Sequence, residues 1–165
     1  MTHRVHSRGY SVIELVVVLG ILGVLAALAQ PLLDLVEQRE KERELRRALW
    51  EIRDAIDTWH TAHDSGALAG GVGAGDDRPG PFPPDLASLA VPRLDARPER
   101  KGARMQFLRR VPRDPFADPR LPAARTWGLR SFQSPADAPQ PGEDVYDVFS
   151  LSTQRGLNGI PLRDW

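Results

Sequence analysis

A long apolar stretch near the start of the chain constrains its fold more than any other feature. From Val12 to Leu33 almost every side chain is apolar, and the exceptions are Glu14, two glycines and the pair Gln30-Pro31. About 20 apolar residues in a helix span the core of a bilayer, and this stretch has that length. We therefore predict a membrane-spanning helix over residues 10–35, in which the buried carboxylate needs a partner or a function.

Glu14 can be interpreted in two ways. In the first helical turn, its carboxylate would lie near the positive end of the helix dipole, where an acid stabilises a helix. The residues before it favour a second interpretation, because a short leader with Arg4 and Arg8 is followed by Gly9 and the aromatic Tyr10. This arrangement resembles the class III signal of type IV pilins and of type II secretion pseudopilins.

The resemblance implies processing and assembly roles for particular residues. A prepilin peptidase would remove the leader, residues 1–9, by cutting after Gly9, and would methylate the new N-terminal Tyr10, where the family usually has phenylalanine. Glu14 would be the signature acid of the family and would pair with the methylated amine of a neighbouring subunit. Pro31 lies where the family often has a proline, and we expect it to kink or loosen the helix.

The charges around the apolar stretch predict a membrane topology. The leader is basic, and Lys and Arg beside a membrane segment stay in the cytoplasm. We expect a single-pass inner-membrane protein with a cytoplasmic N-terminus and a periplasmic head, which is later extracted into a periplasmic filament. Two alternatives remain, which are a secretory signal cut near residues 26–30 and an uncleaved membrane anchor.

The composition limits which partners are expected and how an exported domain could be stabilised. Lys and Arg number 22 and Asp and Glu also number 22, so no nucleic-acid partner is expected. The chain has no cysteine, so an exported domain would be held by core packing or by a metal instead of disulfides.

An amphipathic continuation of the helix is predicted over residues 36–64. Apolar residues follow one another at steps of four and three, which gives one apolar helix face, and the helix should end near Asp64-Ser65-Gly66. The residues of this apolar stripe are Leu45, Leu49, Ile52, Ile56, Trp59 and, at its boundary, His63.

The remainder, residues 65–165, is predicted to be an α+β head packed on the second half of the helix. Gly and Pro dominate residues 66–84, which we expect to be a loop. A short helix should follow over residues 84–91 with Asp85 as its cap, and residues 94–104 should be irregular.

Two later segments are predicted to form an antiparallel pair of strands. Residues 126–132 and 144–151 are rich in aromatic and β-branched side chains and are bounded by Pro, Gly and Asp. A third strand would lie at residues 121–125 or at the C-terminus. The resulting fold class is α+β and pilin-like, with a small antiparallel sheet beside a long N-terminal helix.

The segment Phe107–Pro119 is similar to a stretch of the major pseudopilins of type II secretion. Its Pro-Arg-Asp-Pro-Phe sequence predicts a turn with φ fixed at each proline and with local hydrogen bonds to Asp114. A catalytic role for Asp114 or Asp118 is not expected, because no His or second carboxylate lies at a useful spacing.

The C-terminal residues 150–165 are similar to a calcium-binding loop of the same pseudopilins. The resemblance implies that calcium would be bound by Leu151, Ser152, Asn158 and Asp164. Calcium takes six to eight oxygen ligands, several of them charged, whereas this loop has one acid and also contains Arg155. The alternative is a metal-free loop held by the packing of Leu157, Ile160 and Trp165.

Together these features predict a structural subunit of a type II secretion pseudopilus. Its partners would be copies of itself, prepilin peptidase, the inner-membrane assembly platform, other pseudopilins and membrane lipid. The alternatives are a type IV pilus subunit or minor pilin, acting in adhesion, motility or DNA uptake, and a membrane-anchored periplasmic binding domain. An enzyme is not expected, since the exported part shows no nucleophile–base pair, metal-ligand cluster or cofactor loop.

Overall fold

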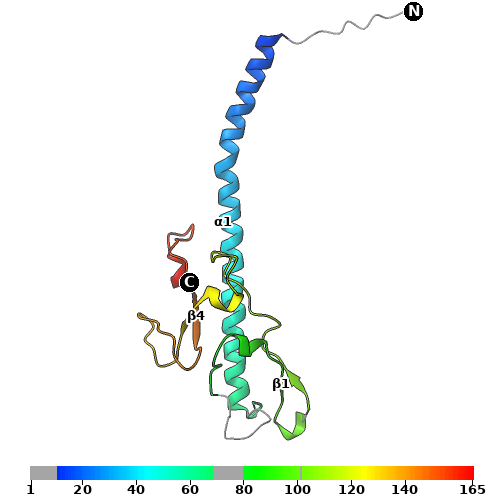
Figure 1. Cartoon of the computed structure of the whole chain (residues 1–165), viewed down its shortest axis with the longest axis vertical. Helices are drawn as coiled ribbons and strands as arrows, with labels where there is room; N and C mark the ends of the chain where they lie inside the picture. The colour runs from blue at the N-terminus through cyan, green and yellow to red at the C-terminus, as the bar shows by residue number, and fades with distance from the viewer. Residues whose placement is uncertain (1–10, 69–79, 101) are drawn as a thin grey trace, which may run out of the picture. The chain divides into compact units, whose positions relative to one another are not determined.

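The fold is α+β and pilin-like, as the sequence predicts. The structure is a computed structural model that describes residues 11–68, 80–100 and 102–165, and the side chains of all of these except residues 27–33. A long N-terminal helix, α1 (Val12–Asp64), is followed by two small antiparallel sheets and by short 3-10 helices (Figure 1). The chain divides into two compact units, Met1–Arg39 and Glu40–Trp165.

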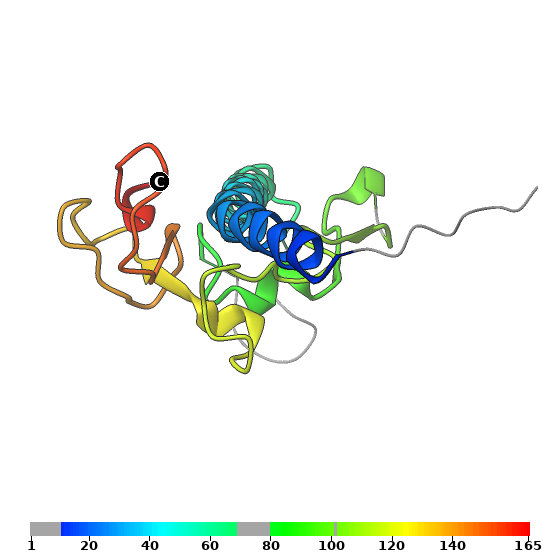
Figure 2. The same cartoon turned by 90° about the horizontal axis from the view of Figure 1, so that it is seen from above.

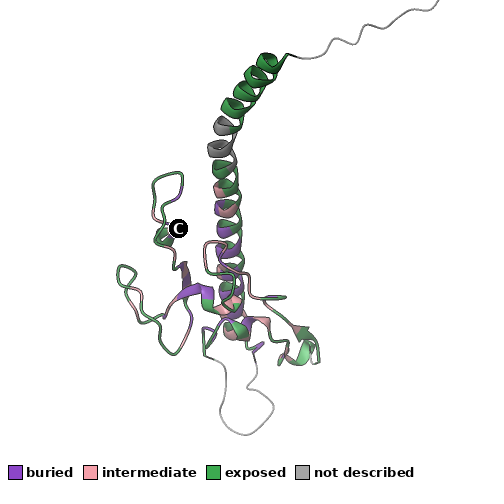
Figure 3. Ribbon diagram, turned by 45° about the horizontal axis from the view of Figure 1, so that its top comes forward, coloured by how far each residue is buried: buried purple, intermediate pink, exposed green. Residues whose placement is uncertain are grey.

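In the first unit, the beginning of α1 displays its side chains on the surface. Every residue from Ser11 to Ala26 is exposed, and apolar side chains such as Ile13 retain much of their accessible area, 72% in that case (Figure 3). The helix is continuous through Pro31, whose side chain lies outside the described residues. Over the residues that the structure describes, no helix is both long enough and apolar enough to cross a membrane.

In the second unit, the apolar stripe of α1 forms the centre of the core. The five predicted residues from Leu45 to Trp59 are all 3% exposed or less, whereas the side chain of His63 is 34% exposed. Ala48 and Ala55 are also buried, and they widen this face of the helix. Full burial of one large apolar side chain stabilises a fold by about 1.5–3 kcal/mol, so this face contributes strongly to the stability of the head.

The helix ends where the sequence predicts. Asp64 is its last residue, and Gly66 adopts a left-handed φ of +69°. The amide of Ala67 then donates to the carbonyl of Ala62 at 2.8 Å. Such a left-handed residue is a common C-terminal cap, which glycine adopts without steric cost.

Two contacts hold the chain on either side of residues 69–79. On one side Leu68 forms an antiparallel bridge with Asp95. On the other side the buried indole N–H of Trp59 donates to the carbonyl oxygen of Gly80 at 3.2 Å. Residues 69–79, the middle of the predicted Gly/Pro loop, lie outside the described residues.

The two sheets lie on opposite sides of the helical segment that runs through the head (Figures 1 and 2). β1 (Arg93–Leu94) pairs with β2 (Arg104–Met105), and β3 (Trp127–Arg130) pairs with β4 (Asp147–Ser150). Both pairs are antiparallel, and Trp127 of β3 and Val148 of β4 belong to the same core as the helix stripe.

The β3–β4 pair confirms the predicted strands, although both are shorter than expected. Beyond Arg130 the amide of Ser131 donates to the carbonyl of Gln140, and the amide of Phe132 donates to the carboxylate of Asp144. These bonds take the donors that a longer ladder would need. The strand therefore ends where the intervening loop supplies its own acceptors.

Other local predictions need correction. The irregular structure expected over residues 94–104 is wrong, because β1 and β2 close a hairpin there, with Gly102 at a φ of +89°. The third strand at residues 121–125 is also wrong, since Ala123–Thr126 form the 3-10 helix η3. The predicted short helix is the 3-10 helix η1 (Ala87–Ala90).

Candidate functional site

Glu14 lies in the first turn of α1, on the surface of the first unit. Glu14 is exposed. The helix begins just before it, where the amide of Leu15 donates to the carbonyl of Ser11 at 3.1 Å. The exposed carboxylate can be reached by a group from another molecule. The leader and the predicted processing residues Gly9 and Tyr10 lie outside the described residues.

Asp114 is a buried carboxylate at the centre of the Pro-Arg-Asp-Pro-Phe turn. It is 1% exposed, and its Oδ1 accepts the amide of Phe116 at 2.7 Å. Its Oδ2 accepts the hydroxyl of Ser150, in β4, at 2.6 Å, while its own amide donates to the hydroxyl of Thr126 at 3.1 Å. The predicted local hydrogen bonding is confirmed. The Asp114 side chain also joins the turn to β4, and its backbone amide joins the turn to η3.

Further hydrogen bonds connect this turn to neighbouring segments of the head. The indole N–H of Trp127 donates to the carbonyl of Pro112 at 2.9 Å, and Arg113 donates to the carbonyls of Asp118 and Leu121. Hydrogen bonds from Arg120 lower the pKa of the Asp118 carboxyl. Both aspartates thus have structural partners, and that neither is catalytic stays a prediction.

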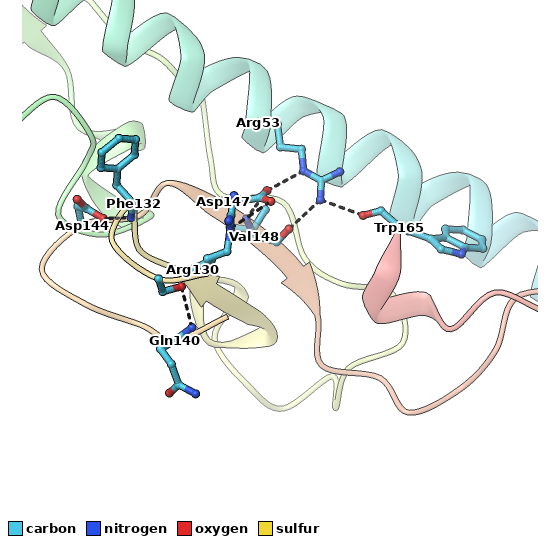
Figure 4. A network of polar contacts seen from close by, with 9 residues as sticks. Arg53, Arg130, Phe132, Gln140, Asp144, Asp147, Val148 and Trp165 are labelled. Carbon is cyan, nitrogen blue, oxygen red and sulfur yellow. Dashed lines mark hydrogen bonds and ion pairs between the residues drawn. The ribbon is translucent and has the colours of Figure 1, made fainter. Parts of the chain in front are cut away.

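Arg53 of α1 links the helix to the sheet and to the end of the chain (Figure 4). Its Nε donates to the carboxylate of Asp147 at 2.8 Å, and its Nη2 donates to the carbonyl of Val148 at 3.1 Å. The same nitrogen donates to the carbonyl of Trp165 at 2.9 Å. One guanidinium thus satisfies acceptors from β4 and from the C-terminal segment together.

Two further charged residues of α1 contact the C-terminal segment. Glu42 is 7% exposed and its carboxylate accepts the amide of Leu157 at 2.7 Å, while the guanidinium of Arg46 lies 4.3 Å from the ring centroid of Trp165. Steps of four and seven residues place Glu42, Arg46 and Arg53 on one side of a helix. We refer to these three residues as the charged helix face.

The sequence did not reveal the charged helix face. Its spacing matches the helical period as well as the apolar stripe does, but a run of charged residues usually indicates a solvated surface. The signal that was available is the periodicity, and the hydrogen-bond partners lie 94 to 115 positions away in the chain.

The predicted calcium ligands have other partners in the structure. The Ser152 hydroxyl accepts the amide of Gln154 at 3.2 Å, and the Asn158 side-chain oxygen accepts the amide of Ile160 at 3.1 Å. Asp164 lies 3.8 Å from the guanidinium of Arg163, and Leu151 is exposed.

These donors do not fit a calcium site, because calcium prefers several charged oxygens. Across the described part of the chain, no cluster of three or more His, Cys, Asp or Glu is arranged to hold a metal ion. Calcium binding itself stays a prediction.

A cavity of about 650 Å³ lies between β4 and the C-terminal segment. Arginines and aspartates line it in equal number, and several of them pair with each other, as Arg53 and Arg130 do with Asp147. Because the charges neutralise one another, this cavity does not indicate a site for a strongly charged ligand. Its lining includes Arg53, Arg130, Asp147, Phe149, Arg163 and Trp165.

Comparison with known proteins identifies the N-terminal segment. Residues 4–29 match the family model described as the prokaryotic N-terminal methylation motif, which is the hallmark of type IV pilins and pseudopilins. No curated protein and no solved structure gives a significant match.

The chain thus carries the hallmark motif of this class on a pilin-like α+β fold. The motif implies a membrane-associated structural subunit that is processed by prepilin peptidase and assembles into filaments.

Proposed function

We propose that this chain is a structural subunit of a type II secretion pseudopilus. The observation that carries the proposal is the methylation motif at residues 4–29, which includes the exposed apolar beginning of α1. An exposed apolar helix face of this kind is suited to burial against lipid or against other copies of the same helix. The turn around the buried Asp114, whose sequence resembles a stretch of major pseudopilins, favours the secretion system over a pilus.

In this proposal the chain is processed and then assembled. It is stored as a single-pass inner-membrane protein with a cytoplasmic N-terminus and a periplasmic head. Prepilin peptidase cuts after Gly9 and methylates Tyr10, and the exposed helices of many copies then form the core of a periplasmic filament. The Glu14 carboxylate would pair with the methylated amine of a neighbouring copy, because an isolated charge is costly in an apolar environment.

Mass spectrometry of the membrane form tests the processing step. In cells with an active prepilin peptidase we expect loss of Met1–Gly9 and one added methyl group on the amine of Tyr10. The same chain expressed without the peptidase serves as the control and should keep its leader. A chain that keeps residues 1–9 beside an active peptidase would contradict the proposal and favour a membrane-anchored binding domain.

A deletion strain separates the secretion system from a pilus. For a pseudopilin, we expect exoproteins to accumulate in the periplasm while surface filaments stay unchanged. A type IV pilus subunit or minor pilin would give the opposite pattern, with loss of adhesion, motility or DNA uptake and with normal secretion.

A further inference from the structure

We propose that the tail loop, residues 152–165, is closed by charged side chains of the chain itself in place of a divalent cation. The contacts that support this are of two kinds, those within the loop and those between the loop and the charged helix face. Both lie within the head, so the inference does not depend on filament assembly or on the proposed function.

Within the loop, the exposed side chain of Arg155 supplies a positive charge that binds the loop backbone. Its guanidinium Nη1 donates to the carbonyl oxygen of Gly159 at 2.9 Å. The loop is also closed by its backbone, since the amide of Gly156 donates to the carbonyl of Ile160 at 2.9 Å. Carbonyl oxygens of this kind are among the ligands that calcium uses in proteins, and here a guanidinium binds one of them.

The charge of the loop agrees with this assignment. The loop contains two arginines and one aspartate, so its side chains carry a net positive charge. A calcium loop needs the opposite sign, because carboxylates supply most of the binding energy. The one carboxylate, that of Asp164, is 56% exposed and lies beside Arg163.

The charged helix face holds the loop from outside. The Glu42 carboxylate accepts the amide of Leu157 at 2.7 Å, and Arg53 donates to the carbonyl of Trp165 at 2.9 Å. Between them the Arg46 guanidinium stacks on the indole ring of Trp165. Hydrogen bonds to charged groups are stronger than those between neutral groups, so these contacts can order a loop whose apolar residues Leu157 and Ile160 are 42% and 47% exposed.

The close fit of Gly156 adds a steric requirement. A Cβ at this position would overlap the Trp165 ring and would lie 2.8 Å from the Asn158 side-chain oxygen. The ring can therefore approach the loop only over a glycine. This contact packs the loop directly against the Trp165 ring.

Hydrogen–deuterium exchange of the full-length chain in detergent tests the proposal. Exchange in peptides from residues 152–165 is measured with excess calcium and with excess EGTA. We expect identical protection in both, and equal melting temperatures. Faster exchange in EGTA, restored by calcium, would overturn the proposal and support the calcium site.

Matched variants test the side chains themselves. Arg155→Gln and Glu42→Ala should each speed exchange of the loop amides about tenfold, as expected for loss of a charge-assisted hydrogen bond. Glu42→Gln keeps an acceptor oxygen and should restore much of the protection. Arg163→Gln and Asp164→Asn are the controls, since the exposed pair that these side chains form lies outside the contacts argued to close the loop, and they should leave exchange unchanged.

The opposite pattern among the variants would contradict the proposal. If Asp164→Asn loosens the loop while Arg155→Gln does not, a cation at the predicted ligands is supported and the proposal is wrong. Peptides from β3 and β4 report whether a variant has lost the whole head. If Arg155→Gln unfolds those peptides, the calcium and EGTA comparison on the unaltered chain still decides the question.

Discussion

Asp114 connects its turn to β4 through its carboxylate and to η3 through its backbone amide. It has two acceptor oxygens, and each is occupied by a donor from a different segment, Phe116 in the turn and Ser150 in β4. A buried carboxylate is tolerated when its oxygens are satisfied in this way, and the donors depend on it in turn. The same two bonds would be lost together if the side chain were removed.

We predict that Asp114→Ala lowers the free energy of unfolding of the head by about 2–3 kcal/mol, because it leaves the buried hydroxyl of Ser150 and the part-buried amide of Phe116 without their acceptor. Urea unfolding followed by tryptophan fluorescence measures the change. Asp118→Ala is the control and should change the stability by less than about 0.5 kcal/mol, since its side chain is 40% exposed. Equal losses in the two variants would argue against the buried network.

Asp95 gives the head a predicted dependence on pH. Hydrogen bonds from the Arg97 side chain lower the pKa of Asp95 from 3.8 to about 2. A carboxyl with a lowered folded-state pKa stabilises the fold fully above its unfolded pKa, and this contribution is lost as the pH falls toward the folded value. The contribution should therefore decline between about pH 5 and pH 2.

Melting curves of the native chain and of Asp95→Asn measure this effect. At neutral pH the native chain should melt at the higher temperature, and the difference should shrink as the pH falls from about 5 to about 2. A difference that stays constant over this range would show that the Asp95–Arg97 pair does not contribute.

Helix α1 changes character along its length, and its second part holds the core. The stripe from Leu45 to Trp59 is buried, whereas the large side chain of Trp50, on the same stretch of helix, is 71% exposed. Side-chain area alone therefore does not determine which residues of this helix stabilise the head. The side of the helix on which a residue lies decides it.

We predict that Ile52→Ala destabilises the head by about 2–4 kcal/mol, because it removes a fully buried side chain and leaves a cavity. Trp50→Ala removes a larger side chain and should change the stability by less than about 0.5 kcal/mol. Chemical denaturation of both variants checks the pair. A larger loss in Trp50→Ala would show that the exposed face makes contacts outside the head.

Strong periodic patterns in the sequence predicted the fold, whereas very short strands and contacts between distant residues could not be predicted from them. The helix stripe, the cap at Gly66 and the β3–β4 pair follow from spacing and residue type. The β1–β2 hairpin has strands of two residues each, which is too short for a period to be visible. The partners of Glu42 and Arg53 lie at the far end of the chain, and the sequence around these two residues does not indicate them.

For the whole molecule, the two units have different tasks in the proposed function. The first unit presents an exposed helix with one acid in its first turn, and the second unit folds around its own core. A change in the first unit should therefore affect assembly without affecting the stability of the head. Glu14 is the residue at which these two effects can be separated.

We predict that Glu14→Ala leaves membrane insertion and leader cleavage intact but greatly reduces filament formation, since the methylated amine of a neighbour would lose its partner. Asp34→Ala replaces another exposed acid of α1 and should assemble normally. Electron microscopy of sheared filaments and immunoblotting of the processed chain provide the two measurements. Normal filaments from Glu14→Ala would contradict the pairing role.

The bridge at Leu68 and the indole bond to Gly80 have a practical consequence for studying assembly. Because both positions are tied to the core independently, a short tag or a single cysteine placed between them should not loosen the head. Since the chain has no cysteine of its own, such a residue could be labelled selectively. A dye at that place would let individual subunits be followed as they leave the membrane.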